Sequence, residues 1–322
     1  MRAAFASVIN ADDPLSGLSV GEQPEPTPPD GDWTTVEVRA SSLNHHDLWS
    51  LRGVGLPEER LPMILGCDAA GVDERGNEVV VHAVIGAQDA ADETLDPDRS
   101  LLSEKYPGTL ADRVAVPRRN LLPKPPELSF TDAACLPTAW LTAYRMLTTR
   151  GQLPPDGAVL VQGAGGGVAT AAVVLAGALG ARVYATSRHA SKRERISALG
   201  ATPLEPGARL PERVDVVIET VGAATMEHSL KAAKQGGRIV ISGTTAGHLA
   251  TVDLRRVFFL QLQLLGSTMG TRDELAHLLR LVVERDIRPV IDSTYGFSRV
   301  RDAFARLATG EVFGKVVLDH TR

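Results

Sequence analysis

The 322-residue sequence predicts an α/β protein with a β-rich first part and a doubly wound parallel sheet after it. Three observations predict this fold class. Up to about residue 125, short runs such as Thr34–Arg39 and Glu78–Ala83 lie between proline and glycine clusters, as strands joined by turns do. From about Pro126, strand-like and helix-like segments alternate, which implies a parallel sheet covered on both faces. A glycine-rich turn joins the first strand and the first long helix of this second part.

Each element of the second part follows from its residue pattern. Ala158–Gln162 is a continuous apolar run, which is typical of a strand buried on both faces. Gly167–Leu179 contains mainly small apolar residues and predicts a helix. Further runs of strand length predict the rest of the sheet: Arg182–Thr186, Val214–Thr220, Arg238–Ser242 and Leu262–Gly266.

The C-terminal segment changes pattern again. Thr271 and Glu274 have the spacing of a capping box ahead of an amphipathic helix. A second helix is expected over about Ser298 to Leu307, and Lys315–Leu318 has the composition of a final strand.

Composition and charge exclude several functions. The chain is 43% hydrophobic and 23% charged, as soluble globular proteins are. A net charge of −5 provides no basic surface for nucleic acid, so we expect no such partner. The two cysteines, Cys67 and Cys135, are too few for a disulfide framework or a four-cysteine zinc site. The N-terminus has no apolar signal region, and the longest apolar stretch, Ala169–Ala181, is too short to cross a bilayer. We therefore expect a cytoplasmic protein with no membrane partner.

The strongest local signal is the glycine-rich turn that follows the apolar run Val159–Val161. Glycines let a backbone turn tightly and approach a pyrophosphate closely, and the next helix offers its unpaired N–H groups to the anion. Alanine stands at both ends of the motif, Ala164 and Ala169, where glycine is commoner. The pattern predicts a dinucleotide site whose turn residues are Ala164, Gly165, Gly166, Gly167 and Val168.

The residues at the end of the next strand decide whether the site binds NADH or NADPH. An NAD site would place an acid there to bind the ribose hydroxyls, but this chain has Ser187 and Arg188, with Lys192 following. A hydroxyl backed by cations suits the 2′-phosphate of NADPH, which we expect as the cofactor. The alternative is that these cations only solvate a helix surface.

Five motifs follow one another along nearly the whole chain. They are Ser42–Trp49 with Arg52-Gly53, Leu61–Gly71, Gly108–Asp112 with Val116-Pro117, Thr142–Tyr144, and Gly314–Leu318. In this order they resemble the motifs of the medium-chain dehydrogenase/reductases, and in particular their zinc-free quinone-oxidoreductase-like branch. Five motifs in register do not occur together by chance.

The resemblance implies a GroES-like catalytic domain formed by residues 1–125 and 266–322. A Rossmann NADP(H)-binding domain, residues 126–265, lies between these segments in the sequence, and the active site would lie in the cleft. The resemblance also implies that the last Rossmann strand, near Phe258–Gly266, pairs across a dimer, so we expect a homodimer. From the residues alone, this apolar stretch is either core or interface.

By the same resemblance, zinc members of the family hold their catalytic ion at the positions of Asn44, Cys67 and Thr138. An amide, a thiol and a hydroxyl make a poor zinc site, because zinc needs several Cys, His or carboxylate ligands. We expect no metal, although His45, His46 and Asp68 lie close enough in the motifs to leave a rebuilt site open.

Without a Lewis acid, an unactivated alcohol loses the usual means of stabilising its alkoxide during oxidation. Hydride donation to an already electrophilic carbon remains natural, because a quinone or conjugated enone spreads the incoming charge onto its own oxygen. We therefore expect a small electrophilic substrate, placed against the nicotinamide in a cleft that excludes water.

Three residues of the first motif are the catalytic candidates. Asn44 would anchor the substrate oxygen or the nicotinamide ribose, or else satisfy loop backbone. His46 stands where zinc members carry a proton-relaying hydroxyl and could pass on a proton, or else is a packing histidine. Asp47 completes the set, with fixing local backbone as its more natural role.

Further cofactor contacts are expected where strands end. Thr142 matches the threonine that family members place beside the nicotinamide, and Lys315 would reach a cofactor phosphate unless it is plain surface charge. Open α/β sheets bind ligands at the C-terminal ends of their strands. The residues at those positions are Val221, Gly222, Gly243, Thr244, Ser267 and Thr268.

The sequence thus predicts an NADPH-dependent reductase of quinones or conjugated enone or enoyl acceptors. Two alternatives stay open: an alcohol dehydrogenase of the same superfamily, and a non-catalytic NADPH-binding protein.

Overall fold

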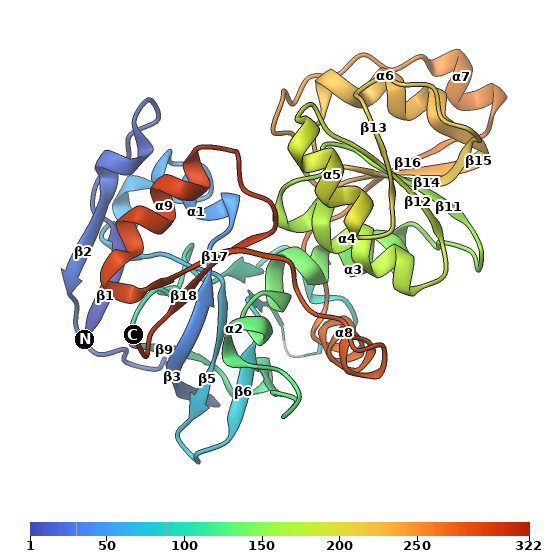
Figure 1. Cartoon of the computed structure of the whole chain (residues 1–322). Coiled ribbons are helices and arrows are strands. Elements are labelled where there is room, and N and C mark those ends of the chain that lie inside the picture. Colours follow the sequence, from blue (N-terminus) through green and yellow to red (C-terminus); the bar gives the residue numbers. More distant parts are fainter. Residues whose placement is uncertain (30, 88) are drawn as a thin grey trace. The chain divides into compact units, whose positions relative to one another are not determined.

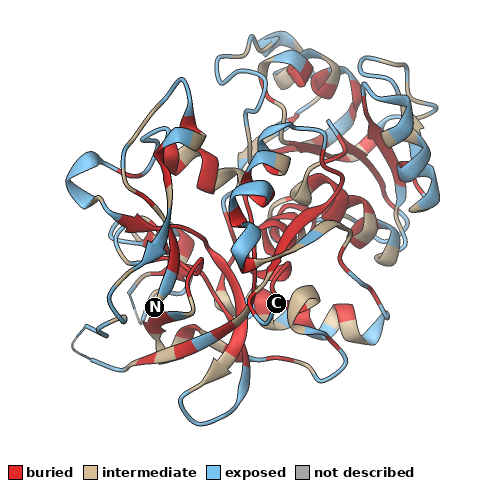
Figure 2. Ribbon diagram, turned by 60° about the vertical axis from the view of Figure 1, so that its left-hand side comes forward, coloured by how far each residue is buried: buried red, intermediate tan, exposed pale blue. Residues whose placement is uncertain are grey.

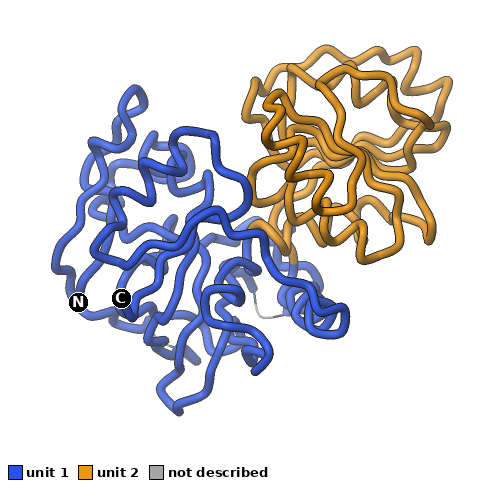
Figure 3. The backbone as a smooth tube through the Cα atoms, in the orientation of Figure 1, with its two compact units in different colours: residues 1–138, 271–322 blue, residues 139–270 orange. Residues whose placement is uncertain are grey.

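The structure is a computed structural model that describes residues 1–29, 31–87 and 89–322 and divides into two compact units (Figure 3). Unit 1 contains Met1–Thr138 and Thr271–Arg322, and unit 2 contains Ala139–Gly270. The sequence placed the boundaries earlier, at 125/126 and 265/266. The first falls later because helix α2 (Phe130–Ala133) packs on the sheet of unit 1, against β3 and β5. The second falls later because the chain stays with unit 2 beyond its last strand, up to Gly270.

Unit 1 is built around the long strand β3 (Trp33–Ser42). It pairs antiparallel with β5 (Asp68–Asp73), β9 (Arg113–Pro117) and the C-terminal strand β18 (Lys315–Asp319). Val317 lies opposite Ser42, so the C-terminal segment completes the N-terminal sheet. The other strands of the unit are β1 (Arg2–Ala6), β2 (Leu18–Glu22), β4 (Met63–Ile64), β6 (Glu78–Val81), β7 (Val84–Ile85), β8 (Ser100–Leu101), β10 (Leu121–Pro123) and β17 (Ile291–Gly296).

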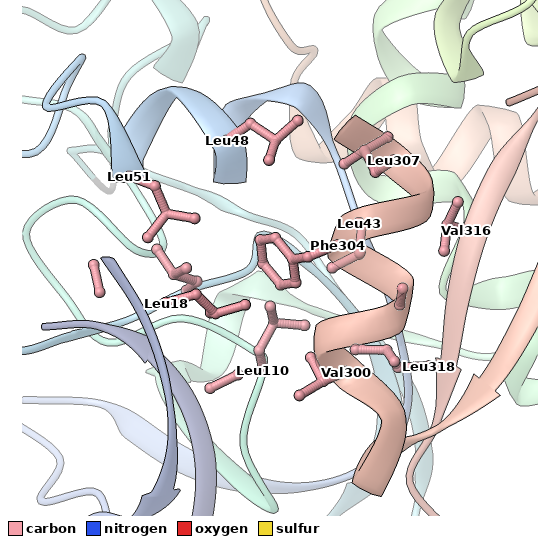
Figure 4. Packing of buried hydrophobic residues seen from close by; sticks show 14 of the residues in the cluster. Leu18, Leu43, Leu48, Leu51, Leu110, Val300, Phe304, Leu307, Val316 and Leu318 are labelled. Atoms are coloured by element: carbon pink, nitrogen blue, oxygen red, sulfur yellow. The ribbon is translucent and has the colours of Figure 1, made fainter. Parts of the chain in front are cut away.

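The core of unit 1 lies between helices α1 (His45–Leu51) and α9 (Val300–Ala308) and the strands beside them. Helix α9 buries Val300, Phe304 and Leu307, the spacing of one helix face. These side chains pack with Leu48 and Leu51 of α1 (Figure 4). Helix α8 (Arg272–Glu284) starts at the predicted capping box, in which the backbone N–H groups of Thr271 and Glu274 each bond the other's side chain.

Unit 2 contains a six-stranded parallel sheet in the order β13-β12-β11-β14-β15-β16 (Figure 1). Its elements are α3 (Leu141–Arg145), β11 (Ala158–Val161), α4 (Gly167–Ala178), β12 (Arg182–Thr186), α5 (Ala190–Ala198), β13 (Thr202–Leu204), β14 (Val214–Glu219), α6 (Ala223–Ala232), β15 (Ala233–Ile241), α7 (Leu254–Phe259) and β16 (Gln263–Gly266). The chain runs outward from β11 to β13 and then returns to β14 on the other side of β11. The strand order therefore reverses between β11 and β14, where doubly wound sheets bind their ligands.

The central strands are buried in both units, as the apolar runs predicted (Figure 2). An antiparallel sheet in unit 1 and a parallel doubly wound sheet in unit 2 confirm the predicted fold class. In the part of the chain that the structure describes, no helix has the length and apolar character needed to span a membrane.

Candidate active site

Asp47 holds the start of helix α1. One carboxylate oxygen accepts the backbone N–H of Asn44 (2.8 Å), and the other accepts the N–H of Gly66 (3.0 Å). The side chain is fully buried, and burial raises the pKa of its carboxyl. Both oxygens are thus engaged with backbone. For Asp47 this arrangement favours the backbone-fixing role over a catalytic one.

A buried ion pair lies beside Asn44. The Lys315 ammonium donates to Asp68 Oδ2 (3.0 Å), Asn44 Oδ1 (2.6 Å) and the backbone oxygen of Leu43 (2.9 Å). Asp68 Oδ2 also accepts from the Asn44 amide (2.9 Å) and the Ser42 hydroxyl (2.7 Å). Asp68 Oδ1 is buried and has no hydrogen-bond partner among the described residues. The network holds the Asn44 side-chain amide in one orientation.

Lys315 is only 2% exposed, and three acceptors of unit 1 surround its ammonium. Lys315 is therefore not a free surface charge, because its buried ammonium neutralises Asp68. The Gly-Lys motif gave no sign of this, since the partner is contributed by another strand 247 residues away. Contact with a cofactor phosphate stays a prediction.

His46 lies between a thiol and a carboxylate. Its Nδ1 is 3.5 Å from Cys67 Sγ, and its Nε2 is 3.1 Å from Glu104 Oε1. The Cys67 thiol donates to the backbone oxygen of Leu102 (3.2 Å), so its sulfur can accept a hydrogen bond from Nδ1. Burial opposes protonation of the ring, but Cys67 and Glu104 outweigh it and raise the pKa of His46 well above its ordinary value.

Both ring nitrogens of His46 therefore face protein groups. This arrangement favours the packing role that the sequence left open over the proton-passing role. The ring ties helix α1 to the segment that carries Glu104, which also accepts the N–H of Leu101 (3.1 Å). Sequence reasoning missed Glu104, because no motif surrounds it and only the fold brings it to His46.

The three positions that the motif resemblance aligns with zinc ligands carry an amide, a thiol and a hydroxyl, those of Asn44, Cys67 and Thr138. Asn44 is held by Asp68 and Lys315, and the Thr138 hydroxyl is buried without a partner among the described residues. Cys67 and Glu104 contact different nitrogens of the His46 ring, so the three groups do not converge on one point. Nowhere in residues 1–29, 31–87 and 89–322 do three or more His, Cys, Asp or Glu side chains form a group that could hold a metal ion.

In unit 2 the glycine-rich turn follows β11. Gly163 has φ +66° and donates its N–H to Thr186 Oγ1 (3.0 Å), and Ala164 donates to the backbone oxygen of Thr186 (2.7 Å). Gly166 is the N-cap of α4, and within the described chain no side chain caps that helix. A Cβ on Gly166 would meet no atom of the described residues within 4 Å, apart from its chain neighbours.

A free helix N-terminus beside open space fits the pyrophosphate of a dinucleotide. Gly165, Gly167 and Val168 complete this turn, as the sequence predicted. The pyrophosphate would be held there by the backbone N–H groups of the first turn of α4.

Most of the other predicted cofactor residues lie within three residues of the C-terminal end of a parallel strand. Ser187 follows β12, and the pairs Val221-Gly222, Gly243-Thr244 and Ser267-Thr268 follow β14, β15 and β16. Because the strands are parallel, these positions lie at the same end of the sheet as the glycine-rich turn, the end formed by the C-termini of the strands. Thr142 is the exception, since it lies buried on helix α3.

The cations after β12 divide into two kinds. Arg193 bonds the backbone oxygen of Ser187 (2.9 Å) and forms an ion pair with Glu205 (3.0 Å), so it fixes the turn. Arg188 is exposed, and Lys192 is half-buried in the first turn of α5. The Ser187 hydroxyl is buried at the strand end. This arrangement suits an anionic ligand at Ser187 and Arg188.

The comparisons with known proteins agree with this architecture. Residues 30–126 match the family model described as alcohol dehydrogenase GroES-like domain, and residues 194–318 match the one described as zinc-binding dehydrogenase. The chain is 27% identical to an acryloyl-coenzyme A reductase of Sulfurisphaera tokodaii, over 95% of this chain and 97% of that protein. It is 30% identical to a 2-methylene-furan-3-one reductase of Solanum lycopersicum, over 89% of this chain and 71% of that protein.

Solved structures give the same result over the full length. A structure titled as an NAD-dependent alcohol dehydrogenase is 33% identical, with a TM-score of 0.91 and 99% of both chains covered. A cobalt- and zinc-bound alcohol dehydrogenase from Pyrobaculum aerophilum is 29% identical, with a TM-score of 0.89 and 99% of both chains covered. The chain belongs to the medium-chain dehydrogenase/reductase family and is an oxidoreductase, which confirms the resemblance read from its motifs.

Proposed function

We propose that the protein is a zinc-independent, NADPH-dependent reductase of a small electrophilic acceptor, either a conjugated enone or enoyl compound or a quinone. The observation that carries this proposal is the Asn44–Asp68–Lys315 network. In it, Asn44, which the motif resemblance aligns with a zinc ligand, is hydrogen-bonded to Asp68 and Lys315. The acceptor class is supported by the named activities of the two curated relatives, which are reductases of an acryloyl thioester and of a methylene furanone.

Bound NADPH would supply the hydride, and a conjugated acceptor takes it at carbon while its own oxygen receives the charge. Such an acceptor needs positioning and exclusion of water more than a Lewis acid. Asn44 Nδ2 carries a second N–H besides the one that it donates to Asp68. This N–H is the anchor that we propose for the acceptor oxygen or the nicotinamide ribose. The 2′-phosphate would be held by Ser187, Arg188 and Lys192.

An acceptor screen on purified protein tests the proposal. We expect NADPH oxidation with enones, enoyl thioesters or quinones, and little reduction of NAD⁺ or NADP⁺ with alcohols. Dominant alcohol oxidation with NAD⁺ would instead support the second candidate, which the 33% identical NAD-dependent alcohol dehydrogenase favours. Dinucleotide binding without turnover of any acceptor would identify a non-catalytic binding protein.

We also propose a homodimer, formed along the free edge of the unit 2 sheet. Strand β16 pairs only with β15 in the described sheet, so its other edge is open to a second chain. Close to it in the sequence, large apolar side chains are exposed: Leu254 is 72% exposed, Phe258 66% and Phe259 71%. A monomeric protein seldom exposes such a group of side chains.

Light scattering at micromolar concentration should therefore give twice the chain mass. Replacing Phe258 and Phe259 by aspartate should shift the protein toward monomer, because charges would be buried in the contact. Leu95→Asp is the matched control, since Leu95 is 73% exposed but lies in unit 1. A wild-type protein of monomer mass would contradict the dimer.

We also propose that the protein works in a reducing compartment, such as the cytoplasm. Cys67 and Cys135 are both free and buried. Burial raises the pKa of each thiol, so neither is activated as a thiolate.

A further inference from the structure

A buried carboxylate at the end of β14 holds the turn that follows it. Glu219 is 0% exposed. Its Oε1 accepts the backbone N–H groups of Val221 (2.9 Å) and Gly222 (3.0 Å). The Thr225 hydroxyl lies 2.8 and 2.9 Å from the two oxygens, and Oε2 also accepts the Ser229 hydroxyl at 2.6 Å. One side chain thereby binds both the Val221-Gly222 turn and two residues of α6, Thr225 and Ser229.

A chain of hydrogen bonds runs from this carboxylate to the glycine-rich turn. The amide of Gln162 donates to Ser229 Oγ (3.0 Å). The Thr186 hydroxyl donates to Gln162 Oε1 (2.8 Å), and the N–H of Gly163 donates to Thr186 Oγ1 (3.0 Å). This series of hydrogen bonds runs from the end of β14 through α6 to Gln162, which follows β11, and to Thr186, which ends β12. Strands β12, β11 and β14 are neighbours in the sheet (Figure 1).

The direction of every bond in this chain is set by the carboxylate. A carboxylate only accepts, so Ser229 must donate to it, and Ser229 can then accept from Gln162. Gln162 consequently presents its oxygen to Thr186, and the Thr186 oxygen remains open for the N–H of Gly163. The second amide hydrogen of Gln162 reaches His228 Nδ1 (3.0 Å). This requires the proton of that imidazole on Nε2, where it meets the backbone oxygen of Ala208 at 2.9 Å.

The glycine-rich turn and the Val221-Gly222 turn also pack directly against each other. A Cβ on Gly163 would lie 2.4 Å from Val221 Cγ2, so the glycine-rich turn packs directly against Val221. The N–H of Val221 is the one that Glu219 accepts. The two turns therefore contact each other on one side and are joined through Ser229, Gln162 and Thr186 on the other. Any shift of Glu219 must move both turns.

We propose that Glu219 is a positioning residue for the dinucleotide, which keeps the Val221-Gly222 turn and the glycine-rich turn in register with each other. It acts through those backbones and does not touch the cofactor. The inference rests on the proposed dinucleotide site of unit 2. It extends that site to a residue that sequence reasoning missed, although an acid closing a buried strand just before Val221-Gly222 was a readable signal.

Calorimetric titration with NADPH tests this role. Glu219→Gln keeps the size but replaces an acceptor oxygen by an N–H group, which reverses or breaks the chain of bonds. We expect the dissociation constant to rise about tenfold or more in protein that circular dichroism shows to be folded. Tyr184→Phe is the matched control: it removes a hydrogen bond to Glu212 from strand β12 without touching either turn, and should leave NADPH affinity unchanged.

A double-mutant cycle separates positioning from simple destabilisation. Glu219→Gln and Thr186→Val alter different strands but the same chain, so their effects on NADPH affinity should be clearly less than additive. If Glu219→Gln does not fold, Ser229→Ala replaces it in the cycle with the same expectation. Additive effects, or wild-type affinity in folded Glu219→Gln protein, would overturn the positioning role alone. Wild-type protein that binds no dinucleotide would overturn the proposed site together with this inference.

Discussion

Replacing Arg188 and Lys192 by alanine should weaken NADPH binding about a hundredfold or more while leaving NADH affinity nearly unchanged. Each charge-assisted hydrogen bond to the 2′-phosphate is worth roughly 1.5–3 kcal/mol, and two are removed. NADH lacks this phosphate, so it loses nothing that these side chains provide. Arg188 is exposed beside the strand end at Ser187, and Lys192 is half-buried in the first turn of α5. Arg193 forms an ion pair with Glu205.

Titration of both cofactors measures this effect. Ser187→Asp should weaken NADPH further, through repulsion between the carboxylate and the phosphate. The matched control is the double variant Arg299→Ala, Arg301→Ala at the start of α9 in unit 1, which changes the net charge by the same amount. If wild type binds NADH as tightly as NADPH, or if the Arg188 and Lys192 variant loses both cofactors equally, these side chains do not select the cofactor.

Replacing Lys315 by methionine should lower the free energy of unfolding by about 3–5 kcal/mol, because it leaves the Asp68 carboxylate buried without its cation. The ammonium is 2% exposed and the carboxylate 0%, so water cannot replace the lost partner. Methionine fills most of the volume, which keeps the loss of packing small. Asn44 also loses the donor that orients its amide, so cofactor or acceptor binding should weaken as well.

Urea unfolding followed by circular dichroism measures the loss. The double variant Lys315→Met, Asp68→Asn should recover part of the stability, because the uncompensated charge is gone. Asp302→Ala breaks the exposed Arg299–Asp302 pair and should change stability by less than about 1 kcal/mol. A Lys315→Met variant no less stable than this control would show that the pair is not a buried ion pair in solution.

The features predicted correctly from the sequence depend on local pattern. Apolar runs located the strands of the parallel sheet, and the spacing of Thr271 and Glu274 located the start of α8. The short strand β13 (Thr202–Leu204) was missed, because three residues are too few to show a period. Strand β15 begins at Ala233, earlier than the apolar run at Arg238 indicated, because residues 234–236 after the buried Ala233 are exposed and contain no large apolar side chain.

The features missed or misread depend on contacts between distant segments. Lys315 was predicted either to contact a cofactor phosphate or to be plain surface charge, since nothing near it in the sequence reveals that β18 places it against Asp68 on β5. Glu104 reaches His46 only through the fold. In the first motif, only the structure shows that Asp47 holds backbone and that both nitrogens of His46 are engaged.

The most direct test of the account is a single assay on chelator-treated protein whose metal content has been measured. Turnover is followed with NADPH and an enone or enoyl thioester, and the product is identified by nuclear magnetic resonance. We expect well below one zinc per chain, undiminished activity after chelation, and one NADPH oxidised for each carbon–carbon double bond reduced. Stoichiometric zinc, with activity that chelation removes and zinc restores, would contradict it.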